Sequence, residues 1–260
     1  MRTSEGRMRR KDAIRRDVFG KLRAVALPDS RFDYDFDNFI PDFAMSPRAL
    51  ERLLNLKLYA GLKLIFTTPD NSLEGFRARA LRDGIRQVIS TYGIRRGMIL
   101  LEPTGEVKRQ EAVAATLDGM ERLAQQGVVR YLALREVQRL GQFDLLVTGA
   151  SAVCTNGVRV GKGHGYFDLE WAMLRMLGVI QEDTPVIAVV HDVQVVDEDL
   201  APEPVDTIVD IIVTPTRTIQ VSRRYPRPER IYWDKLEPGM LDAIPYLTDL
   251  KQFVAKEVVR

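Results

Sequence analysis

Short, unbroken apolar runs recur along this chain, and they limit its possible folds more than any other feature. Strands exposed on one face alternate apolar with polar residues, whereas strands buried on both faces are apolar throughout. Because helical patterns separate these runs, we predict an α/β fold with a mostly parallel sheet and helices on both faces. The predicted strands cover residues 62–66, 98–101, 128–134, 143–147, 185–190 and 208–213.

Helical periodicity fills most of the intervening segments. Ile14, Val18 and Leu22 recur at helical spacing until Pro28 ends the run, and Gly178 marks the end of a later helix. An Asn-Gly pair at 156–157 stands between two apolar runs and predicts a β-hairpin over 151–160. The predicted helices cover residues 11–26, 72–90, 108–126 and 167–177.

No internal repeat or low-complexity linker interrupts this pattern. We therefore expect a single α/β domain over residues 1–260, with an N-terminal helix and a C-terminal tail from about 222 to 260 that either packs back or frays. Residues 29–48 are aromatic and acidic, and we expect them to form a loop that wraps the domain.

Composition narrows the classes of partner. The 38 basic and 36 acidic side chains give a net charge of +2, so no global field attracts the chain to nucleic acid or to a membrane surface. No apolar stretch has membrane-spanning length, and one cysteine and two histidines argue against a zinc site. We expect a cytoplasmic protein that acts on a small molecule as a monomer or homodimer, without nucleic acid or membrane partners.

Three glycines alternate with other residues between the hairpin and the helix over 167–177. They are Gly161, Gly163 and Gly165. Glycine lets backbone N–H groups approach an anion without hindrance from Cβ, and the following helix N-terminus adds unpaired N–H groups. The segment fits neither the Walker nor the Rossmann pattern. It is either a phosphate cradle or a tight turn that needs glycine for its backbone angles.

Charged side chains accompany these glycines. Arg159 and Lys162 could add positive charge to a bound phosphate, and His164 would face the ligand or solvent. Asp168, in the first turn of the helix, could hold Mg²⁺ directly or through water. Because the loop combines glycines, cations and a carboxylate, it is the leading candidate for a phosphate-binding site.

Other polar residues follow the later strands. His191 and Asp192 stand at the end of an apolar strand, where α/β proteins gather their sites, although a histidine there is as often structural. Asp206 and Asp210 lie four residues apart and form either a helix-edge pair or a ligand set.

Residues 161–168 read Gly-Lys-Gly-His-Gly-Tyr-Phe-Asp and resemble the Gly-x-Gly-x-Gly-Tyr-Tyr-Asp signature of the 5-formyltetrahydrofolate cyclo-ligase family. The block that begins at His191-Asp192 and ends at Thr214-Pro215 resembles the closing block of that family. Residues 68–84 and 231–236 look closer to one branch, the cyclo-ligase-like paralogues linked to thiamine metabolism, which often lack shown cyclo-ligase activity.

The resemblance implies a cyclo-ligase fold, related to sugar-phosphate isomerases and coenzyme A transferases, and the use of ATP and Mg²⁺. In the family, ATP phosphorylates the formyl oxygen of 5-formyltetrahydrofolate, N10 attacks the activated carbon, and phosphate leaves to give 5,10-methenyltetrahydrofolate. With the candidates above, the expected site consists of Lys162, Tyr166 and Asp168 for catalysis, Lys11, Arg15, Arg159, Gly161, Gly163, His164 and Gly165 for ATP, His191 and Asp192 for the substrate, and Asp168 and Asp210 for the metal.

Three positions depart from the family signature. Phe167 replaces the second tyrosine, Leu169 replaces an arginine, and Glu170 adds a carboxylate near the expected phosphate. Glu74 is an insecure counterpart of the family's folate-binding glutamate. Two main hypotheses remain: an active cyclo-ligase for a reduced folate or another flat, nitrogen-rich heterocycle, or a diverged paralogue that binds nucleotide and a folate- or thiamine-like ligand without turnover. A third, a sugar-phosphate isomerase or coenzyme A transferase, rests on fold analogy alone.

Overall fold

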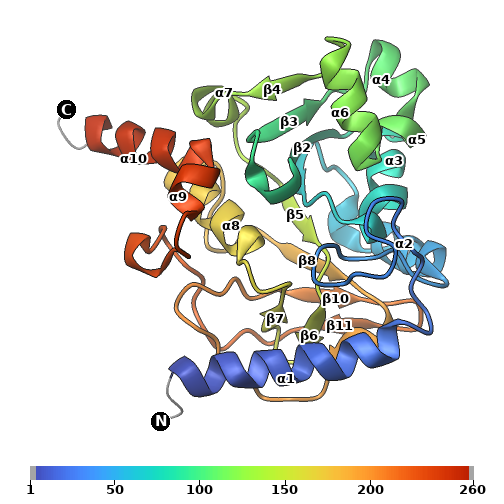
Figure 1. The fold of residues 1–260 in the computed structure, drawn as a ribbon. Coiled ribbons are helices and arrows are strands. Elements are labelled where there is room, and N and C mark those ends of the chain that lie inside the picture. Colours follow the sequence, from blue (N-terminus) through green and yellow to red (C-terminus); the bar gives the residue numbers. More distant parts are fainter. Residues whose placement is uncertain (1–3, 258–260) are drawn as a thin grey trace.

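An eight-stranded sheet forms the centre of the molecule in the computed structural model, which describes residues 4–257 (Figure 1). Its strand order is β11-β10-β8-β5-β1-β2-β3-β4. The five strands from β10 to β2 are parallel, and β11, β3 and β4 add antiparallel edges. The predicted, mostly parallel sheet is confirmed. The strands are β1 (Leu64–Thr67), β2 (Arg86–Ser90), β3 (Met98–Leu101), β4 (Arg130–Leu132), β5 (Leu145–Thr148), β8 (Val186–Val189), β10 (Ile211–Val213) and β11 (Thr218–Gln220).

Helices cover both faces of this sheet because its strands are apolar on both sides. In β1, Leu64 and Phe66 point into one core and Ile65 into the opposite one. The first core contains α7 (Leu134–Arg139), α8 (Tyr166–Met176), α9 (Met240–Ala243) and α10 (Pro245–Glu257). The opposite face carries α2 (Ser46–Leu54), α3 (Glu74–Arg82), α4 (Gly105–Arg109), α5 (Glu111–Ala114) and α6 (Leu117–Gln125).

A second, three-stranded sheet positions the glycine-rich segment. It consists of β7 (Arg159–Val160), β6 (Ala152–Cys154) and β9 (Val195–Val196), in that order. The predicted hairpin is confirmed, since β6 and β7 pair antiparallel. The long helix α1 (Ser4–Leu22) packs on this sheet through Ile14 and Val18 and runs past β6 and β7 in Figure 1.

Several boundaries predicted from the sequence are wrong. The helix predicted over 72–90 ends at Arg82, and β2 begins at Arg86, because Gly84 adopts a positive φ that breaks the helix. The helix predicted over 108–126 is divided into α4, α5 and α6. Helices α2 and α7 and the short strands β9 and β11 were not predicted. Within residues 4–257, no helix has both the length and the apolarity needed to cross a membrane.

The C-terminal tail packs back onto the domain. Tyr246 of α10 is 6% exposed, and its hydroxyl donates a hydrogen bond to the carbonyl of Leu132. Its ring lies against Gly97, where an added Cβ would stand 2.2 Å from the ring. The backbone at Gly97 also has a φ of 74°, so this position requires glycine for two reasons.

Replacing Gly97 by alanine is expected to lower the free energy of unfolding by about 2–5 kcal/mol, because a strained backbone adds to a steric overlap. Gly84→Ala is the matched control, since Gly84 has a φ of 84° but open space around its Cβ position. It should cost only about 1–2 kcal/mol. Chemical denaturation measures both, and equal losses would contradict the close packing of α10.

Candidate functional site

The glycine-rich segment is a wall between two cavities. Arg159, Gly161, His164 and Gly165 border both of them. We call the first the strand-end cavity, since it lies at the carboxyl ends of β1, β2 and β5. We call the second the α1 cavity, since α1 forms one of its sides.

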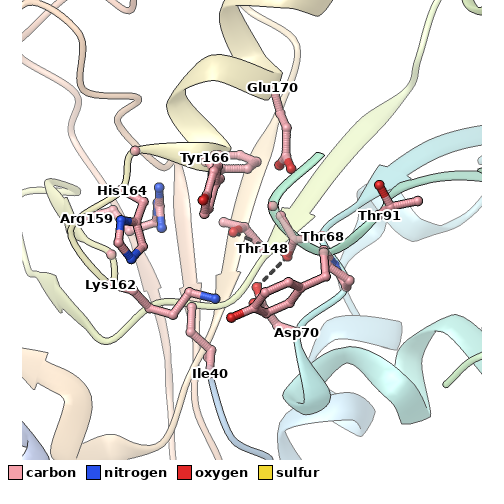
Figure 2. Close-up of a pocket in the computed structure, with 16 residues that line it drawn as sticks. Ile40, Thr68, Asp70, Thr91, Thr148, Arg159, Lys162, His164, Tyr166 and Glu170 are labelled. Carbon is pink, nitrogen blue, oxygen red and sulfur yellow. Dashed lines mark hydrogen bonds between the residues drawn. The ribbon is translucent and has the colours of Figure 1, made fainter. Parts of the chain in front are cut away.

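The strand-end cavity is small and polar, with a volume of about 60 Å³ (Figure 2). Loops after β1 and β2 and the end of β5 face the glycine-rich segment and α8 across it. Its lining includes Thr68, Asp70, Thr91, Thr148, Lys162, Tyr166, Phe167 and Glu170. Parallel strands bring these side chains together because their carboxyl ends meet at one edge of the sheet.

Asp70 is held in place by its own turn and by a neighbouring loop. Oδ2 of Asp70 accepts hydrogen bonds from the Thr68 hydroxyl and from the N–H of Gly149, at 2.9 Å in the second case. The buried guanidinium of Arg77 donates to the carbonyls of Thr68 and Asp70 at 2.8 and 3.0 Å, and burial lowers the pKa of Arg77 to about 10. The turn that carries Asp70 is therefore rigidly positioned.

Lys162 extends from the glycine-rich segment into the strand-end cavity, as Figure 2 shows. Its ammonium donates to the carbonyl of Asn38 at 3.2 Å and lies 5.2 Å from the centre of the Tyr92 ring. Burial lowers the pKa of Lys162, and the charge of Asp70 opposes this shift. A cation is thus available beside the cavity without a fixed carboxylate partner among the described residues.

Glu170 reaches the strand-end cavity from α8. It is 2% exposed, and Oε2 of Glu170 has no hydrogen-bond partner among the described residues. Burial raises the pKa of Glu170 to about 8; the nearby Ser90 hydroxyl lowers it, and the charge of Asp70 raises it further. The carboxyl group is therefore mostly neutral at pH 7.

The α1 cavity is larger, with a volume of about 340 Å³. Basic side chains of α1 and β7 line one side, and the C-terminal segment supplies an apolar wall. The basic residues of α1 and β7 are Lys11, Arg15 and Arg159, and the apolar residues are Leu169 and Ala172 of α8 with Ile231, Leu236 and Met240 of the C-terminal segment. This combination suits a ligand that has both an apolar ring and negative charge.

The basic residues of the α1 cavity are tied to the glycine-rich segment and to acidic partners. Arg15 donates through Nε to the carbonyl of Gly161 at 2.9 Å. Lys11 forms an ion pair with Asp206 at 2.5 Å. Buried Nε of Arg159 has no partner among the described residues, so it remains available to an acceptor.

Asp168 lies in the first turn of α8 and borders the α1 cavity. One of its oxygens accepts a hydrogen bond from the N–H of Thr207 at 2.8 Å, and the other lies 3.4 Å from Nη2 of Arg159. Residues 4–257 contain no group of three or more potential ligands from His, Cys, Asp and Glu that could hold a metal. A metal held here by protein carboxylates alone is therefore not supported.

The structure brings most of the predicted site residues together, on two sides of one wall. Lys162 and Tyr166 border the strand-end cavity, and the four shared residues border both cavities. The predicted residues Lys11, Arg15, Gly163 and Asp168 border the α1 cavity. Glu170, expected near the phosphate, borders the strand-end cavity instead.

His191 and Asp192 border neither cavity, although they follow β8 as expected. Nδ1 of His191 accepts the N–H of Val193 at 3.2 Å. Asp192 accepts the hydroxyls of Thr214 and Thr216. Both side chains form hydrogen bonds to neighbouring loop residues and lie outside the two cavities, so we do not retain them as substrate residues.

Asp210 directly precedes β10 and lines neither cavity. Its carboxylate accepts the N–H of Val186 at 2.8 Å and forms ion pairs with Arg227 and Arg223. Because these partners already satisfy the carboxylate, we remove Asp210 from the metal ligands.

Sequence reasoning missed Thr68, Asp70, Thr148 and the C-terminal wall of the α1 cavity. The Thr-Thr-Pro-Asp sequence directly after the first strand was available as a signal, since polar residues at that position face the site edge of a parallel sheet. The C-terminal wall had no comparable signal except the family resemblance of residues 231–236.

A model of the 5-formyltetrahydrofolate cyclo-ligase family matches residues 7–215. The chain belongs to this family, and the predicted membership is confirmed. It is 35% identical over 245 residues to the methenyltetrahydrofolate synthase domain-containing protein of Homo sapiens, covering 93% of this chain and 61% of that protein. The corresponding Danio rerio protein is 33% identical over 242 residues, covering 92% and 60%. The chain thus spans about three fifths of the length of these curated relatives.

A solved structure also resembles this chain. The NMR structure of Aquifex aeolicus 5,10-methenyltetrahydrofolate synthetase has a TM-score of 0.48 and 15% sequence identity, and the similarity covers 86% of this chain and 98% of that one.

Glu170→Gln is expected to stabilise the protein more at pH 8 than at pH 5. The folded state holds the pKa of Glu170 at about 8, above its ordinary value, so the wild type loses stability as pH rises between these two values. The gain in melting temperature should exceed about 4 °C at pH 8 and be close to zero at pH 5. Thermal unfolding monitored by circular dichroism measures this gain in melting temperature. If the gain is the same at pH 5 and at pH 8, Glu170 is ionised in both the folded and the unfolded protein.

Proposed function

We propose that this protein is an ATP- and Mg²⁺-dependent enzyme of the cyclo-ligase type. It would bind the nucleotide in the α1 cavity and a reduced folate, or a related flat heterocycle, in the strand-end cavity. The observation that carries this proposal is the shared wall: Arg159, Gly161, His164 and Gly165 border both cavities. A phosphate bound along this wall would be within reach of a ligand on the other side.

The chemistry of the α1 cavity supports a nucleotide. Its apolar wall fits a base, and Lys11, Arg15 and the unpaired Nε of Arg159 fit phosphate oxygens. Gly163 has a φ of 116°, a backbone conformation that residues with a β-carbon rarely adopt. The adjacent N-terminus of α8 favours the same negative charge.

Asp168 is the residue that would hold Mg²⁺. A single carboxylate fits this ion, because Mg²⁺ usually binds one or two carboxylates together with substrate phosphates and water. When bound, the ion would neutralise charge on the transferring phosphoryl group. Asp206 is less suitable, since its carboxylate already pairs with Lys11.

In the proposed reaction the formyl oxygen of 5-formyltetrahydrofolate forms a bond to the γ-phosphorus, and ADP leaves. N10 then attacks the activated carbon and loses its proton to solvent, and phosphate departs. Lys162 borders the strand-end cavity, so its ammonium would stabilise the oxygen of the second substrate that gains negative charge, and Tyr166 would position the ring.

A diverged paralogue that binds both ligands without turnover is the second candidate. Phe167, Leu169 and Glu170 favour it, because the first two remove polar groups of the family signature and the third adds a buried carboxyl group. A ligand related to thiamine remains a prediction of this second candidate.

Lys162→Met is expected to reduce methenyltetrahydrofolate formation by about 10²–10³-fold, because it removes a cation aimed at the reacting oxygen. The Kd for ADP should change little, since Lys162 faces the strand-end cavity. Absorbance at the methenyltetrahydrofolate band, with 5-formyltetrahydrofolate and Mg-ATP, measures turnover. Lys21→Met, on the exposed side of α1, is the matched control. A flat trace from wild-type protein that still binds ATP would favour the diverged paralogue.

Gly163→Ala should weaken ATP binding by roughly tenfold, because the positive φ resists a β-carbon and the cradle would change shape. Gly141→Ala is the control, with a φ of 94° in a loop outside both cavities. Calorimetric titration with Mg-ATP compares the two. Unchanged affinity in Gly163→Ala would remove the cradle assignment.

Leu169→Arg restores the cation of the family signature on the edge of the α1 cavity. We expect it to increase any weak cyclo-ligase rate, whereas Leu169→Met should not. The same absorbance assay measures both variants. If Leu169→Arg does not increase the cyclo-ligase rate, the divergence lies in the pocket for the second substrate rather than in the cations that would bind phosphate.

A further inference from the structure

The basic residues that border the α1 cavity differ in whether they have acidic partners. Lys11, Arg15 and Arg159 each form an ion pair with a carboxylate of the protein. Arg230 and Lys235, of the C-terminal segment, border the same cavity and are exposed. Among residues 4–257, neither of these two side chains has an ion-pair or hydrogen-bond partner. Their charges are therefore available to a ligand without the loss of an existing contact.

The α8 side of this cavity lacks a cation that the family signature contains. Leu169 borders the α1 cavity at the position where that signature has an arginine. Phosphate groups bind best to cations that donate hydrogen bonds to them. The cations that remain on α1 and β7 would have to share their carboxylates with a bound phosphate. A polyphosphate in this cavity therefore needs positive charge from another part of the chain.

The C-terminal segment runs antiparallel to α8. The N–H of Ile231 donates to Sδ of Met176 at 3.3 Å, near the end of the helix. Farther along the chain, Oε2 of Glu237 lies 3.6 Å from Nδ1 of His164, before the helix begins. Leu169 and Met176 are seven residues apart and so share one face of α8. The residues between the two contacts consequently pass along the face of α8 that bears Leu169.

This segment is held firmly enough to define where its cations lie. Nε1 of the buried Trp171 donates to the carbonyl of Pro228 at 2.8 Å. Ile231 and Met240 are 2% and 8% exposed, so apolar burial fixes the segment on both sides of Lys235. Lys235 ends a short 3₁₀ turn, Trp233–Lys235, at the edge of the cavity.

We propose that Lys235, together with Arg230, binds the phosphate groups of the ligand in the α1 cavity and supplies the charge that Leu169 removes from α8. Both residues lie beyond the part of the chain that the family model matches, residues 7–215. The C-terminal segment is then part of the phosphate site of this chain, in addition to being an apolar wall. The inference rests on the proposed function in one respect, the binding of the nucleotide in the α1 cavity.

The first test compares wild type, Lys235→Met, Arg230→Met and the double variant in calorimetric titrations with Mg-ATP and with adenosine. Each single variant should bind Mg-ATP about three- to tenfold more weakly, and the double variant more weakly than either, because an exposed cation contributes a screened but direct contact. Affinity for adenosine should not change, since adenosine has no phosphate.

Lys63→Met is the matched control for these titrations. Lys63 is exposed, has no ion pair among residues 4–257, and borders neither cavity. Its replacement should leave both affinities unchanged. Wild-type affinity of the double variant for Mg-ATP would overturn the inference. An equal loss for adenosine and Mg-ATP would also overturn it, because the two residues would then act on the shape of the cavity rather than on phosphate.

A second test asks whether Lys235 replaces the missing cation of α8. Leu169→Arg, added to Lys235→Met, should restore the affinity for Mg-ATP to within about twofold of wild type, whereas Leu169→Met in the same background should not. Leu169→Arg alone should raise the affinity by a smaller factor, because Lys235 already supplies the charge. An equal gain in both backgrounds would show that the two positions act independently and would overturn the replacement.

Titration with tripolyphosphate separates this inference from the proposed function. If the wild type binds Mg-ATP and the variants bind it equally well, nucleotide binding stands and the role of Lys235 and Arg230 is refuted. If the wild type binds tripolyphosphate but not Mg-ATP, and Lys235→Met weakens that binding, the nucleotide is refuted and the phosphate-binding role of Lys235 stands. If the wild type binds neither, both are refuted.

Discussion

The packing of α1 on the small sheet is the contact on which the candidate site depends. Ile14 and Val18 share a buried cluster with Val158 and Val160, so the helix lies alongside the strand that leads into the glycine-rich segment. Arg15, on the same helix, can then donate to the carbonyl of Gly161. This contact fixes the segment as a wall with one cavity on each side.

The two cavities differ in how their charges are compensated. In the α1 cavity, the basic residues of α1 and β7 have acidic partners, such as Lys11 with Asp206, and a bound anion would compete with these carboxylates. In the strand-end cavity, Lys162 and Glu170 have no ionic partner among the described residues. Burying a polar or charged group without a partner lowers the stability of the folded protein. Such groups concentrate at sites where a bound ligand supplies the missing hydrogen bond or opposite charge.

The departures from the family signature fall into two groups by position. Leu169 faces the α1 cavity, where it replaces a cation with apolar surface. Phe167 and Glu170 face the strand-end cavity. The guanidinium carbon of Arg159 lies over the Phe167 ring, 4.8 Å from the ring centre. The departures therefore lie on both sides of the glycine-rich segment, with two of the three at the strand-end cavity.

The sequence by itself determined the local features: apolar runs that become central parallel strands, the Asn-Gly hairpin, the end of α8 just before Gly178, and the glycine-rich segment with its cations. These depend on backbone preference and on burial periodicity, which neighbouring residues encode. Among them, the glycine-rich segment was specific enough to indicate the family, together with the block from His191 to Pro215. The sequence did not separate β2 from α3, because a nine-residue helix followed by a buried strand resembles one longer apolar helix until Gly84 is known to adopt a positive φ.

Only the tertiary structure decided which side chains meet. It placed Asp70 and Glu170, one hundred residues apart, at one cavity, and it directed Lys162 away from the cations with which the sequence had grouped it. It also placed His191, Asp192 and Asp210 outside the lining of both cavities and gave each of them local partners. The physical reason is that side-chain direction and burial depend on strand order and helix packing, and these contacts join residues far apart in the chain.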